Sequence, residues 1–141
     1  MVRKIKVKNS GLIKLQVFDD FPDGNLIIGE ANKSVPFSIK RVYYINNLYN
    51  RKAERGKHAH KTSEQIIFCI NGHFTLTLDD GEKEQSISMN NPIYGVRLGP
   101  KLWHTMTRFS SDCVILVLAN DYFNENDYIR NYQDFLNYVK K

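Results

Sequence analysis

Two histidines separated by one residue, His58 and His60, are the side chains of this 141-residue sequence best suited to chemistry. Side chains alternate between the two faces of a strand, so both imidazoles would project from the same face. Imidazole titrates near neutral pH and also binds metal ions, so the pair predicts either acid/base chemistry or part of a metal site. The two histidines could instead be surface residues with only a structural role. This is disfavoured because Arg55 and Gly56 precede them, and glycine lets the backbone approach a ligand closely.

A nearby arginine and tyrosine could bind an anionic, polar ligand. Arg41 and Tyr43 share one face of a strand expected at residues 37–46. A guanidinium pairs with a phosphate through two parallel hydrogen bonds, and a phenol suits a sugar hydroxyl. The alternative is that Tyr43 is a core side chain with its hydroxyl at the rim, while Arg41 forms a surface ion pair.

The other two histidines, His104 and His73, are expected in different surroundings. His104 follows Trp103 after a Gly-Pro turn, and neighbours in a strand face opposite sides, so only one of the two can face the interior of a barrel. His73 directly follows the Asn71-Gly72 turn and is expected to be a solvated turn residue.

Short strands must position these residues. Apolar runs or alternating patterns recur along the chain between turn dipeptides, which is typical of an antiparallel sandwich or barrel. We expect strands at residues 11–18, 25–30, 37–46, 55–60, 65–70, 73–78, 85–89, 93–98 and 113–118. The spacing of apolar residues after Asn120 predicts a helix over about the last 20 residues, packed on the outside of the barrel. One domain, residues 1–141, is expected.

Composition narrows the partners and the location. The net charge of +5 suits an anionic small molecule, and no nucleic-acid-binding motif is present, so nucleic acid is not an expected partner. No apolar run approaches the roughly 18 residues of a membrane span, and no signal peptide is recognisable, so a cytoplasmic protein is expected. Cys69 and Cys113 lie in apolar runs and are expected to be buried and reduced.

The order and spacing of several motifs resemble the sugar 3,4-ketoisomerases, which act on TDP-4-keto-6-deoxy-D-glucose. The resemblance covers roughly residues 12–139. Its motifs include Pro36-Phe37-Ser38-Ile39-Lys40-Arg41-Val42-Tyr43-Tyr44-Ile45, Arg55-Gly56-x-His58-x-His60-Lys61, Gly99-Pro100-x-x-Trp103 and Asp127-Tyr128-Ile129-Arg130.

The resemblance implies an all-β fold, a cupin or jelly-roll antiparallel β-barrel with a C-terminal helix, and a homodimer without a cofactor. It implies an isomerase that moves the keto group from C4 to C3 through an enediol, in TDP-3-amino-3,6-dideoxyhexose biosynthesis. In this reading His60 is the main acid/base, His58 its partner, and Tyr43 stabilises the enediolate. Substrate would be bound by Arg41, Arg55, Gln65, Trp103 and His104.

A metal site is the main competing use of the histidines. His58, His60 and His104, with Glu64, superficially supply three imidazoles and a carboxylate. In metal-binding cupins the carboxylate stands seven residues before the glycine that ends its strand, and counting back from Gly72 reaches Gln65. A slip of one residue turns Glu64 to the opposite face, and an amide is a poor ligand for a divalent ion. We therefore expect no metal.

Two other activities share these motifs. A TDP-sugar 3- or 3,5-epimerase uses the same Arg-Gly-x-His segment, and a non-catalytic or metal-dependent cupin would have the same fold.

Two positions bear on the configuration of the product. Asp23 departs from the arginine or tyrosine that relatives carry before Gly24, while His104 suggests the galacto-configured 3-keto product.

Overall fold

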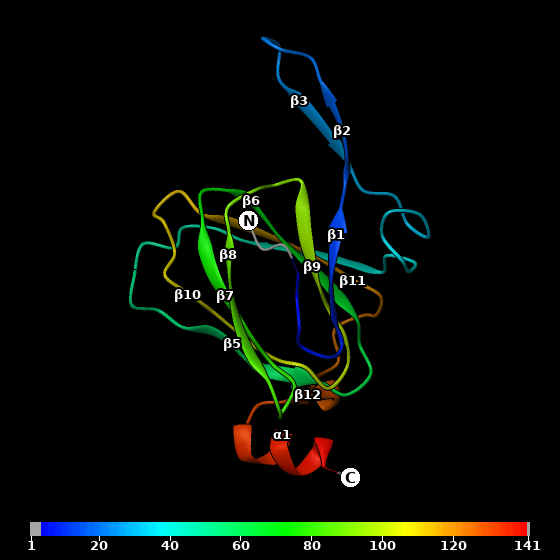
Figure 1. Cartoon of the computed structure of the whole chain (residues 1–141), viewed down its shortest axis with the longest axis vertical. Coiled ribbons are helices and arrows are strands. Elements are labelled where there is room, and N and C mark those ends of the chain that lie inside the picture. The colour runs from blue at the N-terminus through cyan, green and yellow to red at the C-terminus, as the bar shows by residue number, and fades with distance from the viewer. Residues whose placement is uncertain (1–3, 141) are drawn as a thin grey trace.

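Two five-stranded antiparallel sheets pack face to face in the computed structural model, which describes residues 4–140 (Figure 1). Across the first sheet lie β1 (Ser10–Lys14), β9 (Tyr94–Leu98), β6 (Gln65–Asn71), β11 (Val114–Ala119) and β4 (Arg41–Ile45). Across the second lie β12 (Tyr128–Ile129), β5 (Arg55–His60), β10 (Trp103–Thr107), β7 (Phe74–Asp79) and β8 (Glu84–Met89). This architecture confirms the cupin-like β-barrel that the sequence predicts.

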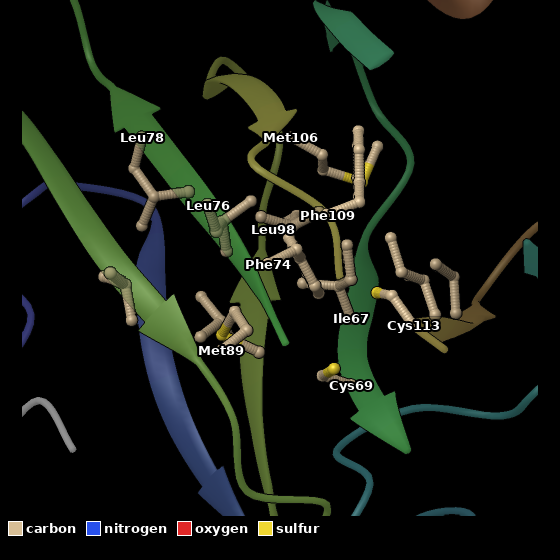
Figure 2. Close-up of a cluster of buried hydrophobic side chains, with 14 of the residues drawn as sticks. Ile67, Cys69, Phe74, Leu76, Leu78, Met89, Leu98, Met106, Phe109 and Cys113 are labelled. Carbon is tan, nitrogen blue, oxygen red and sulfur yellow. The ribbon is translucent and has the colours of Figure 1, made fainter. Parts of the chain in front are cut away.

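The alternation of side chains explains how the sheets enclose a core. In β7 the residues Phe74, Leu76 and Leu78 are almost fully buried, while the threonines between them are only partly buried. Figure 2 shows these three side chains in one cluster with Ile67 of β6 and Met89 of β8. Burying a large apolar side chain stabilises a fold by roughly 1.5–3 kcal/mol, so this cluster fixes which face of each strand points inward.

Strand β6 is buried on both faces. Ile67 and Cys69 face the central core, whereas Ile66 and Phe68 pack against Val35 and other apolar residues on the outside of the first sheet. The two cysteines, Cys69 and Cys113, are each 1% exposed, which confirms the prediction that they are core residues.

A hairpin formed early in the sequence extends away from the two sheets. It consists of β2 (Gln16–Asp19) and β3 (Asn25–Ile28), and Figure 1 shows it projecting beyond the barrel. The sequence predicts one strand over residues 11–18, which is wrong. The first half pairs with β9 and the second with β3, and at the break the Leu15 N–H donates to the Ile93 carbonyl, 2.9 Å away.

The predicted C-terminal helix is present but shorter than expected. Helix α1 spans Tyr132–Val139, and the Asn131 side chain caps it by accepting from the Asp134 N–H at 3.0 Å. The preceding residues form a 3₁₀ turn, Glu125–Asp127, and then strand β12, whose Tyr128 pairs with His60 of β5. Pairing with a distant strand overrides the helical spacing there. No helix within residues 4–140 is long and apolar enough to cross a membrane.

Candidate active site

A cavity of about 410 Å³ opens between the two sheets, and strands β4, β5 and β10 supply most of its wall. Four side chains that the sequence selects, Arg41, Tyr43, Arg55 and His58, line it together. The full lining comprises Arg41, Tyr43, Ile45, Arg55, Gly56, His58, Met106, Phe123, Tyr128 and Arg130. Cationic, phenolic and imidazole groups therefore share one cavity with several apolar side chains.

Three imidazoles cluster at the wall of this cavity. The His58 ring lies 5.0 Å from the His60 ring and 4.6 Å from the His104 ring, measured between centroids. His58 is half-buried and lines the cavity, whereas His60 and His104 are 1% and 2% exposed and lie behind it. His73 is exposed, as the sequence predicts for a turn residue.

The structure settles which neighbour in β10 faces the interior. His104 joins the histidine cluster, and Trp103 faces the opposite way, where its ring lies 5.3 Å from the Tyr132 ring and 5.7 Å from the Phe135 ring of α1. Trp103, which the sequence suggests as a substrate-binding residue, therefore does not line this cavity. Strand alternation permits only one of the two residues to point inward, and the helix covers the other.

Each imidazole has its Nδ1 fixed by an oxygen acceptor. His60 Nδ1 lies 3.1 Å from Asp127 Oδ2, and His58 Nδ1 lies 3.0 Å from the Gly56 carbonyl oxygen. His104 Nδ1 lies 3.3 Å from the Leu102 carbonyl oxygen. Carbonyl and ionised carboxylate oxygens only accept, so every Nδ1 carries the proton and donates it. In a neutral ring the lone pair is then on Nε2.

Burial keeps these rings neutral. It lowers the pKa of His58 to about 4, and the neighbouring His60 adds to the effect. Burial also lowers the pKa of His104 well below its ordinary value. For His60 burial again lowers the pKa, although the hydrogen bond to Asp127 opposes the shift. All three are therefore neutral imidazoles at pH 7, with a lone pair available to accept a proton or to bind a cation.

Asp127 anchors the cluster from the 3₁₀ turn. Its Oδ1 accepts from both the backbone N–H and the hydroxyl of Thr62 at 2.8 Å, and its Oδ2 accepts from the Ser63 N–H and from His60. Burial acts to raise the pKa of this carboxyl, but the hydrogen bonds outweigh it and lower the pKa to about 2. The ionised carboxylate fixes the His60 ring and its tautomer.

The register argument at Gln65 holds in the structure. Gln65 is fully buried and its Oε1 accepts from the Tyr43 hydroxyl at 3.1 Å, while Glu64 instead forms an ion pair with Arg97. Burial raises the pKa of Tyr43 to about 12, so the phenol stays neutral and can donate a hydrogen bond. Gln65 supports Tyr43 from behind and does not itself line the cavity.

Three guanidinium groups make the cavity a site for anions. Arg41 lies 5.5 Å from the Tyr43 ring centroid, and its buried Nε has no hydrogen-bond partner within residues 4–140. Arg55 lines the same cavity. Arg130 is held by Glu125 at 2.6 and 2.9 Å and lies 4.3 Å from the Tyr128 ring centroid. A buried, unpartnered guanidinium N–H is a ready donor to a phosphate oxygen.

Sequence reasoning missed part of this site. Asp127, Tyr128 and Arg130 belong to a motif that supports the family resemblance, but their apolar neighbours predict a helix and no site role follows from it. Phe123 and Met106 also line the cavity, and no signal in the sequence distinguishes them from ordinary core residues. Only the pairing of β12 with β5 brings Asp127 and Tyr128 beside the histidines.

Fold and cavity together define a cupin suited to moving protons on an anionic ligand. Comparison with known proteins agrees. Residues 8–140 match the family described as "FdtA: WxcM-like, C-terminal". A TDP-4-oxo-6-deoxy-alpha-D-glucose-3,4-oxoisomerase from Aneurinibacillus thermoaerophilus is 51% identical over 120 residues, which is 84% of each chain. The chain belongs to this family of TDP-4-keto-6-deoxyglucose 3,4-ketoisomerases.

Solved structures show the same relationship. A mutant of the 3,4-ketoisomerase QdtA from Thermoanaerobacterium thermosaccharolyticum, in complex with TDP-4-keto-6-deoxyglucose, has a TM-score of 0.92 and 38% identity, covering 95% of this chain and 96% of that one. A 3,4-ketoisomerase from Helicobacter canadensis has a TM-score of 0.89 and 38% identity, covering 94% and 98% of the two chains.

Proposed function

We propose that this protein is a TDP-4-keto-6-deoxy-D-glucose 3,4-ketoisomerase that acts through histidine acid/base catalysis and an enediol. The observation that carries the proposal is the combination, in one cavity, of a neutral imidazole, a neutral phenol and arginines. The named activity of the Aneurinibacillus relative and the keto-sugar bound to QdtA support the same substrate.

The cavity chemistry suggests how the substrate is oriented. The pyrophosphate would bind to Arg41 and Arg55, because guanidiniums form paired hydrogen bonds with phosphate oxygens. The keto-hexose would then extend toward His58 and Tyr43, which can exchange a proton and donate a hydrogen bond. Tyr128 and Phe123 add aromatic surface to the same wall.

The proposed reaction needs no net gain or loss of electrons. A base removes the proton from C3, the electron pair forms the C3–C4 double bond, and O4 takes up a proton. The enediol then loses its proton from O3 as C4 accepts one, which leaves the carbonyl at C3. Each positioned proton transfer contributes roughly 10²–10⁴-fold. The Tyr43 O–H, which donates to Gln65 in this structure, would turn to the substrate oxygen and stabilise the charge that develops there.

We assign the carbon base to His58 and a supporting role to His60, which reverses the order expected from the sequence. His58 lines the cavity, whereas His60 is 1% exposed and is tied to Asp127. Only the ring at the cavity wall can touch a carbon of the substrate. His60, held by Asp127, would fix the position of the His58 ring from behind, since the two ring centroids lie 5.0 Å apart.

The sequence also suggests the product and its use. We propose the galacto-configured 3-keto sugar, on the basis of His104, and its consumption by an aminotransferase that gives a TDP-3-amino-3,6-dideoxyhexose. The stereochemistry at C4 follows from which face of the enediol receives the proton, and the His104 ring lies 4.6 Å from the His58 ring that lines the cavity.

Turnover in D₂O tests the activity. Purified protein is incubated with TDP-4-keto-6-deoxyglucose and the product is analysed by NMR. We expect a 3-keto sugar that carries deuterium at C4, and the same reaction run in H₂O should give the H4–H5 coupling of a galacto configuration. A product that keeps its C4 carbonyl and is inverted at C3 or C5 would instead identify an epimerase.

Paired asparagine variants test the division between the histidines. We expect His58→Asn to abolish both product formation and exchange of the C3 proton, with TDP binding retained. His60→Asn should reduce the rate while leaving measurable exchange. If His58→Asn still exchanges the C3 proton at the wild-type rate, the carbon base is another residue.

We further propose that two copies form a homodimer through the outer face of the first sheet. An apolar groove of about 520 Å³ lies there, lined in part by Leu26, Ile70 and Leu118. Leu26 and Phe18 of the projecting hairpin are 59% and 51% exposed, and Ile70 is 44% exposed. A second copy would remove this apolar surface from water.

Light scattering of the purified protein should give the mass of a dimer. Leu26→Glu should shift the equilibrium toward monomer. A wild-type monomer would contradict the proposal.

A further inference from the structure

The histidine cluster has the geometry of a three-imidazole metal site. Among residues 4–140, the ligand atoms of His58, His60 and His104 lie within 4.8 Å of one another. Because each Nδ1 donates to an oxygen, the free lone pair of each ring is on Nε2. The Nε2 of His60 is buried and has no hydrogen-bond partner within the described residues. None of the proton transfers in the proposed mechanism uses the Nε2 lone pair of His60 or of His104.

The atoms around the rings are those that tune metal ligands. Metal-binding histidines usually donate their second N–H to a carboxylate or a backbone carbonyl, which fixes the ring and raises its basicity. Asp127 accepts the Nδ1–H of His60, the Gly56 carbonyl accepts that of His58, and the Leu102 carbonyl accepts that of His104. The arrangement supplies three nitrogen ligands, and one of the three rings, His58, lines the cavity, from which a fourth ligand could come.

We propose that His58, His60 and His104 bind a single divalent transition-metal ion, Zn²⁺ being the best match, and that this ion inhibits the enzyme. Three histidines with an open fourth position are a common zinc arrangement. Bonds of about 2.0 Å place tetrahedral nitrogens roughly 3.3 Å apart, and one nitrogen from each of the three rings already lies within 4.8 Å of the others. Gln65 excludes a carboxylate from the set, but three imidazoles suffice without one.

Inhibition follows from the shared lone pairs, and this part rests on the proposed function. An Nε2 that coordinates Zn²⁺ cannot accept a proton from C3, so the metal-bound enzyme would be inactive until a chelator removes the ion. Oxygen-preferring Mg²⁺ should neither bind this nitrogen site nor inhibit through it.

Zn²⁺ binding to the full chain is measured without substrate, so that the test of the metal site does not depend on the proposed activity. Calorimetric titration with ZnCl₂ should give one ion per chain, and CoCl₂ should give the visible absorption of tetrahedral Co²⁺. His104→Gln should weaken Zn²⁺ binding by more than the roughly 10–100-fold that loss of an outer-shell partner costs, and Asp127→Asn should fall within that range. His73→Gln, which changes the exposed fourth histidine, should bind like the wild type.

A second variant and a second measurement distinguish loss of the metal site from misfolding. Zn²⁺ should raise the melting temperature of the wild type and of His73→Gln but not that of His58→Gln, whose ring is half-buried. In the activity assay, Zn²⁺ should inhibit wild type and His73→Gln equally, with recovery on adding EDTA. Equal Zn²⁺ affinity in wild type and both cluster variants, or no binding at stoichiometric metal, would overturn the site. Tight binding without inhibition would overturn only the inhibitory role.

Discussion

Replacing Tyr43 by Phe removes one hydroxyl from the cavity and leaves the ring in place. The hydroxyl donates to Gln65 Oε1 at 3.1 Å, and Gln65 Nε2 already lacks a partner within residues 4–140. The variant therefore leaves a fully buried amide with neither end bonded. An unsatisfied buried polar group costs about 1–3 kcal/mol, so we expect the free energy of unfolding to fall by that amount.

The effect on turnover should be larger than the effect on stability. Removing one donor to a developing oxyanion lowers kcat by about 10²–10³-fold. Because the pKa of Tyr43 is raised to about 12, the phenol is neutral throughout the neutral range, and the loss should not depend on pH there. KM for the nucleotide sugar should change little, since Arg41 and Arg55 are untouched.

The assay compares initial rates of 3-keto product formation, by NMR or by chromatography, with urea denaturation of the same samples. Tyr44→Phe is the matched control, because Tyr44 is adjacent in β4, 67% exposed and on the opposite face. A Tyr43→Phe enzyme with kcat within about threefold of Tyr44→Phe would refute the role of the phenol as a donor in the reaction.

Three further predictions concern the charge and shape of the fold. The folded-state pKa of His58 is about 4 against an ordinary 6.5, so the unfolded chain binds more protons in acid; stability present above pH 6.5 should decline by about 2 kcal/mol at pH 5 from this ring alone, and equal urea midpoints at both pH values would contradict this. Arg55→Ala should weaken TDP binding by roughly 10–150-fold, measured by calorimetry, because it removes a charge-assisted hydrogen bond; an unchanged Kd would place the pyrophosphate elsewhere. Gly72→Ala should destabilise the fold by at least about 1–3 kcal/mol in urea melts, since φ is +71° and the added Cβ would lie 2.9 Å from Cys113 Cα; a wild-type midpoint would show that the turn can relax.

The parts of the site that lie close together in the sequence could be predicted from it. Strand alternation placed His58 and His60 together, and the count from Gly72 correctly turned Gln65 inward and Glu64 outward. Alternation alone could not decide between Trp103 and His104, because that choice depends on which face of β10 the helix α1 covers.

The contribution of the C-terminal segment could not be predicted because it depends on long-range pairing. The apolar spacing around Tyr128 and Ile129 resembles that of a helix, yet these residues form a strand beside His60 and Ala59. Nearly seventy positions separate Asp127 from His60, and only the folded chain makes them hydrogen-bond partners. Local periodicity carries no information about such a contact.

The position of Trp103 has a practical consequence for spectroscopy. It is the only tryptophan in the chain, and its indole packs against Tyr132 and Phe135 on the outside of the barrel. Intrinsic tryptophan fluorescence therefore reports how α1 docks against β10, whereas a nucleotide in the cavity lies on the other side of that strand. A change in emission on heating marks the release of the helix, and ligand titrations of this protein need a signal other than its tryptophan.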